Sequence, residues 1–293
     1  MTKTSIAIWV ILFLAVLAAA FFWANRPRRI IIDAALPANF PEQGFSHDSF
    51  AVLLQSYVSD DGRVDYDHWQ QSATARQQLE SYLAAVSQFS PKATPERFSS
   101  RNDELAYWMY GYNAYVIRSV LDHWPLESVT DVKAPVEAVK GLGFFYQQRF
   151  SFGGEFMSLL DAENKEIRKK YQDPRIHFFL NCASESCPVA RPGLPVGDDL
   201  DQLLAQAAID FINDSENVAV DHDNKVVQLS TIFKWYKDDF VNHVRLDGEL
   251  VGNGLIAYVS RYASDELAAG LTQAGDYEVQ FREYDWGLNA TVD

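Results

Sequence analysis

The sequence predicts an α+β protein in which a helical N-terminal half packs on a small mixed or antiparallel sheet, preceded by a single N-terminal transmembrane helix. Three observations lead to this prediction. Apolar residues recur at helical spacing from residue 46 onward, short alternating segments bounded by turn residues follow from residue 149, and Ile6–Ala24 contains no charged residue.

The composition limits the class of protein. The chain has 293 residues, 48% of them hydrophobic, which is enough for a substantial core. Its net charge is −15 and no cluster of Lys and Arg follows residue 30, which argues against a nucleic-acid-binding surface. Two cysteines are too few for a disulfide scaffold or a four-thiolate zinc site. We predict no cofactor.

The N-terminus predicts a membrane anchor. Ile6–Ala24 is long enough to span a bilayer as a helix and is followed by Arg26, Arg28 and Arg29. The alternative is a cleavable signal peptide with a site near Ala18–Ala20. We therefore divide the chain into an anchor or signal peptide (1–25), a proline-containing linker (26–45) and one globular domain (46–293). The predicted location is the inner membrane with the domain in the periplasm, or the periplasm itself after cleavage.

The first helices follow from apolar residues spaced three and four apart. One is expected from about Asp48, a second ends at Ser90–Pro91, and the turn Asp60–Gly62 lies between them. The apolar positions that define these helices are Phe50, Leu53, Leu54 and Tyr57, and then Leu79, Tyr82, Leu83 and Val86.

The most informative helix runs from about Asn102 to Asp122. It is apolar nearly all round, so it belongs in the middle of the domain. Asn113 is therefore expected inside the protein, where its amide needs hydrogen-bond partners. Gly111 costs about 1 kcal/mol in a helix relative to Ala, which indicates close backbone packing.

The second half alternates hairpins and helices. Two hairpins are predicted, over 149–157 and 218–229, and a final strand over 277–281. Helices are predicted from Ser158 to Tyr171, over 200–211, after Ser230 and over 255–263. The helix after Ser230 places Trp235 and Tyr236 beside Asp238 and Asp239, which fits either a pocket or a core stripe with a solvated edge.

Residues 173–192 read DPRIHFFLNCASESCPVARP and contain both cysteines. We predict a strand over Ile176–Leu180 that ends in a small polar loop, a place where a rigid scaffold presents reactive groups. On a regular strand His177 and Cys182 point to opposite faces. Cys187, beyond the turn, reaches the imidazole more easily.

This segment allows four interpretations. Cys187 or Cys182 could be a nucleophile with His177 as base and Asn113 or a carboxylate orienting it. The cysteines could instead form a structural disulfide, which suits an oxidising compartment. They could also be a redox pair, but four residues separate Cys182 from Cys187, whereas thioredoxin-like motifs have two residues between their cysteines. A zinc site would be one ligand short in this stretch, so we predict no metal.

These residues resemble the domain of unknown function 547 (DUF547) family. The similar blocks are AYWMYGYNA at 106–114, the 158–168 segment, DPRIHFFLNCASESCP at 173–188, IFKWYKDDF at 232–240 and YDWGLN at 284–289. The resemblance matches Asn113, His177, Asn181, Cys182, Ser184, Cys187, Pro188, Lys234 and Tyr236 to the family pattern. It implies no particular reaction. Where members often have Ile-Glu-His, this chain has Ala162-Glu163-Asn164, and Asn164 cannot shuttle a proton.

Two functions remain open. The first is a thiol-dependent hydrolase or transferase acting on a peptide-like or thiol-containing small molecule, with Cys187 or Cys182 attacking, His177 as base, and Asn113 or Glu163 orienting it. The second is a non-catalytic module that binds a ligand or partner and carries a Cys182–Cys187 disulfide.

Overall fold

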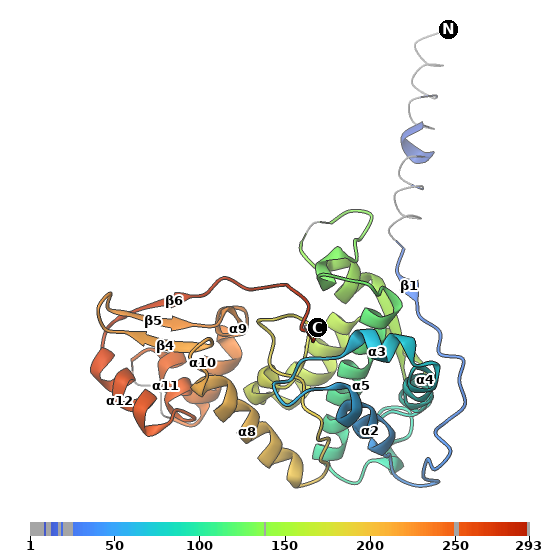
Figure 1. The fold of residues 1–293 in the computed structure, drawn as a ribbon, viewed down its shortest axis with the longest axis horizontal. Helices are drawn as coiled ribbons and strands as arrows, with labels where there is room; N and C mark the ends of the chain where they lie inside the picture. The colour runs from blue at the N-terminus through green and yellow to red at the C-terminus, as the bar shows by residue number, and fades with distance from the viewer. Residues whose placement is uncertain are drawn as a thin grey trace.

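A computed structural model describes residues 9, 13–16, 19, 26–137, 139–248 and 252–291. It is an α+β fold with two lobes, each of which has its own hydrophobic core and a small mixed sheet. Figure 1 shows the helix-rich larger lobe from the first half of the chain and the smaller lobe from the second half. The prediction of one small sheet is corrected, since the described strands form two three-stranded sheets.

The larger lobe is built around α5 (Arg101–Asp122), whose burial on nearly all sides confirms the prediction. Ser100 caps this helix by accepting the N–H of Asp103. Gly111 allows the close packing inferred from the sequence, since an added Cβ would lie 3.1 Å from Val86 and 3.2 Å from Phe152. The helices α3 (Tyr66–Gln71) and α4 (Ala73–Gln88) pack against α5, and α2 (Asp48–Tyr57) packs against α4.

The sheet of this lobe has the order β1-β2-β3 (Arg28–Arg29, Gln148–Phe152, Glu155–Met157). The β2–β3 hairpin confirms the prediction and turns at Gly153–Gly154, both with positive φ. The helical segment that follows is continuous, made of α6 (Leu159–Asp161), the π-helical η4 (Ala162–Arg168) and α7 (Lys169–Tyr171).

The smaller lobe packs helices against the sheet β4-β5-β6 (Val218–Asp221, Val226–Leu229, Glu278–Phe281). The predicted hairpin and final strand are confirmed, with β6 parallel to β5. Aromatic rings of Phe178, Phe233, Phe240 and Tyr258 form its centre. Its helices are α8 (Asp199–Asn213), α9 (Thr231–Trp235), α10 (Lys237–Leu246), α11 (Gly254–Ser260) and α12 (Asp265–Ala274).

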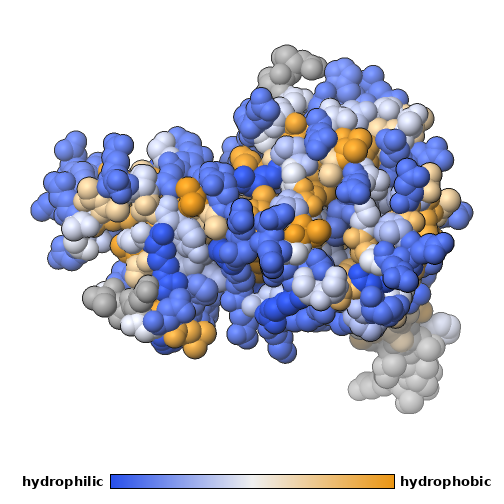
Figure 2. All heavy atoms as spheres, turned by 90° about the horizontal axis from the view of Figure 1, so that it is seen from below, coloured by the Kyte–Doolittle hydropathy of each residue, from blue (hydrophilic) through white to orange (hydrophobic). Residues whose placement is uncertain are grey.

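The C-terminal segment after β6 returns from the smaller lobe to the larger one (Figure 1). It forms single β-bridges from Gly287 to Ser128, from Leu288 to Ser184 and from Ala290 to Val64. These bridges fix Tyr284 and Trp286 between the lobes. Figure 2 shows one face of the molecule, largely hydrophilic, with several apolar patches between the smaller and larger parts.

The remaining connections are short helical turns. They are η1 (Pro95–Arg97), η2 (Val129–Asp131), the π-helical η3 (Gly143–Gln147) and η5 (Pro174–Phe178). The predicted strand over Ile176–Leu180 is therefore wrong, because η5 occupies its first residues. Asp173 caps this turn by accepting the N–H of Arg175, and Pro174 takes the first helical position.

The predicted linker is packed onto the domain. Arg28 and Arg29 pair with β2, Phe45 packs on Phe98, and Arg97 donates to the carbonyl of Gly44. Backbone pairing and aromatic burial thus bring residues 28–45 into the fold. Most of the predicted anchor, Ile6–Ala24, lies outside the described residues, and among those described no helix is long and apolar enough to cross a bilayer.

Candidate functional site

A cleft of about 300 Å³ lies where the two lobes meet. Its floor and walls come from α5, η4, the 177–188 segment, α9 and the C-terminal segment, and the 139–146 segment forms one side of its mouth. The lining is Tyr112, Val139, Lys140, Gly141, Leu142, Phe145, Tyr146, Leu160, Glu163, His177, Leu180, Cys182, Cys187, Pro188, Ile232, Trp235, Tyr236, Tyr284 and Trp286.

One wall is the cysteine loop, and Asn113 positions it. The Asn113 amide donates to the carbonyl of Phe179 at 3.2 Å and accepts the N–H of Asn181 at 2.9 Å. Asn181 in turn donates to the carbonyl of Pro188 and accepts the N–H of Ala183, both at 2.7 Å. The Asn113 amide thus has hydrogen-bond partners at both ends, but the residue is only partly buried, which corrects the prediction that it lies inside. It positions the loop backbone and makes no hydrogen bond to the His177 imidazole among the described residues.

Cys182 and Cys187 form a disulfide in this wall. The N–H of Cys182 donates to Cys187 Sγ at 2.7 Å, and Tyr284 Oη lies 2.9 Å from Cys182 Sγ. Ala183, between them, has a φ of 59°, a left-handed conformation that costs a non-glycine residue free energy. Since both cysteines are bridged, neither sulfur is a thiol in this structure. No metal-binding cluster of His, Cys, Asp and Glu occurs among the described residues.

His177 is buried and its ring stacks on Tyr236, with ring centroids 3.8 Å apart. Its Nε2 lies 2.8 Å from Asp239 Oδ2. Because the Asp239 carboxylate can only accept, Nε2 carries the proton and donates. Burial lowers the pKa of His177, and the hydrogen bond to Asp239 opposes this effect. The partner of His177 is thus a carboxylate of α10. The sequence-based hypothesis instead expected His177 to act on a cysteine.

Asp239 connects His177 to Arg168. Arg168 Nε donates to the same Oδ2 at 2.8 Å, and its guanidinium lies over the ring of Tyr236. Burial raises the pKa of Asp239, but the hydrogen bonds from His177 and Arg168 outweigh it and lower this pKa to about 2. Asp239 and Arg168 line a second, polar cavity on the far side of His177.

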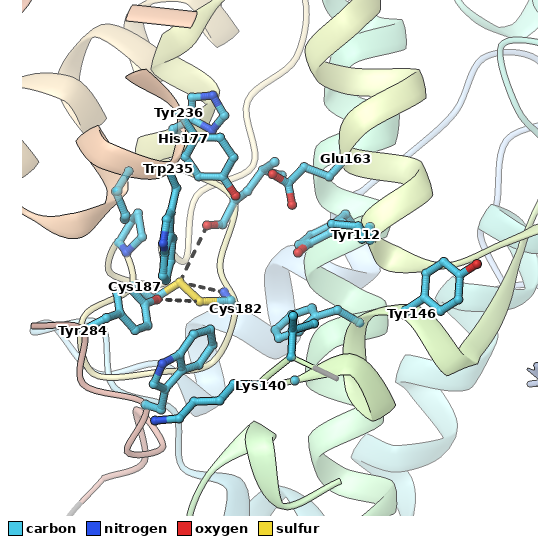
Figure 3. A pocket seen from close by; sticks show the side chains of 18 of the residues that line it. Tyr112, Lys140, Tyr146, Glu163, His177, Cys182, Cys187, Trp235, Tyr236 and Tyr284 are labelled. Carbon is cyan, nitrogen blue, oxygen red and sulfur yellow. Dashed lines mark hydrogen bonds between the residues drawn. A yellow bond between two sulfur atoms is a disulfide. The ribbon is translucent and has the colours of Figure 1, made fainter. Parts of the chain in front are cut away.

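Glu163 points into the cleft from η4 and is only 7% exposed (Figure 3). It is the one acidic residue among the described residues that line the cleft. The Tyr236 and Tyr112 hydroxyls both point toward its carboxylate (Figure 3). Burial, and then the Glu163 charge, hold the pKa of Tyr236 well above its usual value. Burial likewise holds the pKa of Tyr112 well above its usual value, so both phenols are neutral at physiological pH.

Three aromatic rings form the side opposite η4. Trp235 lies 4.6 Å from Tyr284 and 5.7 Å from Trp286 by ring centroids, and Tyr284 lies 4.6 Å from Trp286. Trp235 remains 47% exposed, an unusual exposure for so large a ring. The site thus combines a cluster of tilted aromatic rings with one buried carboxylate, an arrangement suited to binding a ligand that has an apolar body and a cationic group.

The sequence anticipated some of these residues. Cys182, Cys187, His177 and Glu163 all line the cleft, and Asn113 supports it from behind. Asn164, which stands where family members often have histidine, lines the second cavity and not this cleft.

Tyr112, Lys140 and Arg168 were not predicted as site residues. Tyr112 looked like one of many core positions on α5, and Lys140 and Arg168 had no motif around them. The aromatic residues beside acids at 235–239 were the signal for Tyr236 and Asp239.

The comparisons with known proteins agree with the motifs. A family model described as a protein of unknown function, DUF547, matches residues 95–212. That segment contains α5, η4 and the complete cysteine loop. No curated protein and no solved structure matches the chain.

Proposed function

We propose that this chain, whose residues 95–212 belong to the uncharacterised DUF547 family, is a small-molecule-binding domain that takes an amine with an apolar body into its cleft. The observation that carries the proposal is Glu163, a buried carboxylate in an otherwise largely apolar cleft. The hydroxyl groups that face it belong to neutral phenols, and the Arg168 guanidinium is directed to Asp239. No direct ion pair of Glu163 occurs among the described residues, and only the more distant Arg168 charge acts on it. A buried charge in that position is costly, and a bound ammonium group would offset the cost.

The aromatic lining supports the same ligand class. Cations are attracted to the faces of Trp and Tyr rings, and Trp235, Tyr284 and Trp286 gather opposite Glu163. The Lys140 side chain extends away from Glu163, so it leaves the inner end of the cleft negative (Figure 3). The net charge of −15 further favours the approach of cations.

Tryptophan fluorescence tests this proposal, because two tryptophans line the cleft. The probes are the amide of an aromatic amino acid with a free amino group, and the same compound acetylated on nitrogen. Wild-type protein should bind the free amine, and Glu163→Gln should bind it about tenfold or more weakly, a loss of about 1.4 kcal/mol or more. The acetylated compound should bind both proteins equally and more weakly.

The matched control is Glu166→Gln. Glu166 lies on the same helix and is 9% exposed, but it pairs with Lys92 outside the cleft. It should leave amine binding unchanged. Equal binding of the free and acetylated compounds by wild type, or equal losses in both variants, would show that Glu163 does not recognise an amine.

For the location of the domain we propose an extracytoplasmic domain tethered to the membrane by Ile6–Ala24. The Cys182–Cys187 disulfide supports this, since disulfides persist in oxidising compartments. Fractionation tests it: the full chain should stay in the membrane fraction after a carbonate wash, and a protease should digest the domain only from the periplasmic side. Release by carbonate would contradict the tether.

Thiol-dependent hydrolase or transferase chemistry is a second candidate, favoured by the position of both cysteines in the cleft. It requires reduction of the disulfide. The Cys182 N–H, 2.7 Å from Cys187 Sγ, would then stabilise a Cys187 thiolate that attacks an acyl carbon and releases the leaving group. Acyl-adduct formation by mass spectrometry, with reductant and without it, tests this candidate, and no adduct on reduced protein would reject it.

A further inference from the structure

Exposed apolar side chains surround the outer mouth of the cleft. Val139, Tyr146 and Leu160 line it and are 63%, 39% and 43% exposed, and Val136 on the same loop is 46% exposed. Apolar residues gathered in this way on a surface mark an interaction site. The cleft therefore opens through an apolar rim, which we define as Val136, Val139, Tyr146 and Leu160.

The apolar rim lies on the side where the chain enters the domain. β1 pairs Arg28 and Arg29 with Gln148 and Arg149, and Arg149 lies over the ring of Tyr146. In Figure 1 the green loop before β2 and the entry of the chain at β1 both lie at the top of the larger lobe. Four residue steps separate Ala24 from Arg28, and a fully extended chain of that length spans at most roughly 14 Å. A tether that ends at Ala24 thus keeps this side of the domain close to the bilayer.

The charge on this side differs from that of the whole protein. Arg26, Arg28 and Arg29 lie exposed where the chain enters the fold, and Lys133 and Lys140 are exposed on the 133–142 loop. The one acidic residue of that loop, Glu137, accepts the N–H groups of Ala134 and Leu142, so it is tied to the loop backbone. Apolar side chains among basic ones are typical of segments that lie in the interface of an anionic bilayer.

We infer that the apolar rim docks on the bilayer surface, so that the cleft opens into the lipid interface and draws its ligand, a lipophilic amine, from the membrane. This inference rests on the proposed function for the chemistry of the ligand and on the proposed tether for orientation. The interaction surface itself is argued from exposure, charge and the position of β1.

Site-specific fluorescence in the full chain tests the inference. Val139→Cys is labelled with an environment-sensitive dye; the native cysteines are bridged and do not compete. The protein is reconstituted in vesicles of phosphatidylcholine with phosphatidylglycerol. The emission of the dye at position 139 should shift to the blue. Iodide should quench this dye about fivefold less than it quenches the same dye free in buffer, since the apolar face of an interfacial segment is buried at the headgroup boundary.

The matched control is Val52→Cys on α2, a valine that is 55% exposed far from the rim. Its dye should remain fully accessible to iodide in the same vesicles. A second variant, Val136→Asp, should release the rim from the bilayer. It should slow uptake of an alkylamine dissolved in the vesicles while leaving binding of the water-soluble amine amide unchanged.

The outcomes separate the proposals. Equal quenching at positions 139 and 52 overturns the docking inference even if amine binding is confirmed. A shielded position 139 with no amine binding supports docking and rejects the proposed function. Failure of the chain to float with the vesicles overturns both the tether and the docking.

Discussion

The side chain of Asn113 is hydrogen-bonded to the backbone of Asn181: Asn113 Oδ1 accepts the Asn181 N–H at 2.9 Å. The first residue lies in the centre of α5 and the second begins the disulfide loop. Through this bond the most buried helix of the larger lobe determines where the cysteine loop meets the cleft. The same amide also binds the carbonyl of Phe179, so both of its ends are used.

Asn113→Ala should therefore destabilise the protein by about 2 to 3 kcal/mol, because it leaves the Asn181 N–H and the Phe179 carbonyl without their partner. Urea unfolding measures the loss, and hydrogen exchange of the Asn181 amide should accelerate. Asn164→Ala, on the rim of the second cavity, is the control and should cost less than 1 kcal/mol. Equal losses in the two variants would show that Asn113 does not hold the loop.

The disulfide should contribute to stability. Replacing both Cys182 and Cys187 by Ser should lower the free energy of unfolding by about 2 kcal/mol, the loop-closure entropy expected for so short a loop. Thiol titration of native protein without reductant should find no reactive thiol, and reduction under denaturing conditions should release two. Two reactive thiols in the native protein would instead favour the thiol-dependent function.

The His177–Asp239 pair predicts a direction for titration. The folded-state pKa of His177 lies below 6.5 because of burial, while the hydrogen bond to Asp239 raises it. Asp239→Asn removes the negative acceptor, so the His177 pKa should fall further. NMR titration of the imidazole Cε1–H, assigned with His177→Gln, measures both values. A higher pKa in Asp239→Asn would contradict the pairing.

His47 predicts a loss of stability in acid. Burial lowers its pKa to about 3, with an opposing effect of Asp103, and its Nδ1 bonds to the hydroxyl of Tyr82. Between pH 6.5 and 3 the unfolded chain binds this proton and the folded chain does not. Stability is therefore fully present above pH 6.5 and declines as the pH falls, by about 2 to 3 kcal/mol at pH 4.5.

The test compares wild type with His47→Gln, which keeps a hydrogen-bonding side chain beside Tyr82. The difference in unfolding free energy between pH 7 and 4.5 should be smaller in the variant by about 2 kcal/mol. Other groups that titrate in this range are common to both proteins. An identical difference in the two proteins would mean that His47 does not stay neutral in the folded state.

Several errors of the sequence-based prediction have one cause. Ile176–Leu180 has the composition of a strand, yet η5 forms there because Asp173 and Pro174 start a helical turn. Whether an apolar segment becomes a strand depends on a partner strand elsewhere in the chain, and its own composition does not show that partner. Likewise 28–45 lacks periodicity but is held by Arg28, Arg29 and Phe45 through partners more than fifty residues away. Local patterns carry no information on such partners.

Local patterns in the chain were enough to predict α2, the end of α4, α5 and the two hairpins, and to place the resemblance of the central segment to the DUF547 family, because periodicity and motifs are local properties. They did not predict α3, and they placed Asn113 deeper than it lies. They also marked His177, Glu163 and the cysteines as neighbours of a site. The partners of these residues are set by the folded chain: His177 pairs with Asp239, Tyr236 lies at Glu163, and Trp286 lies beside Trp235. Those pairs form where the two lobes meet. Their residues are far apart in the sequence, so the distances between them and their burial are set only by the packing of the folded chain.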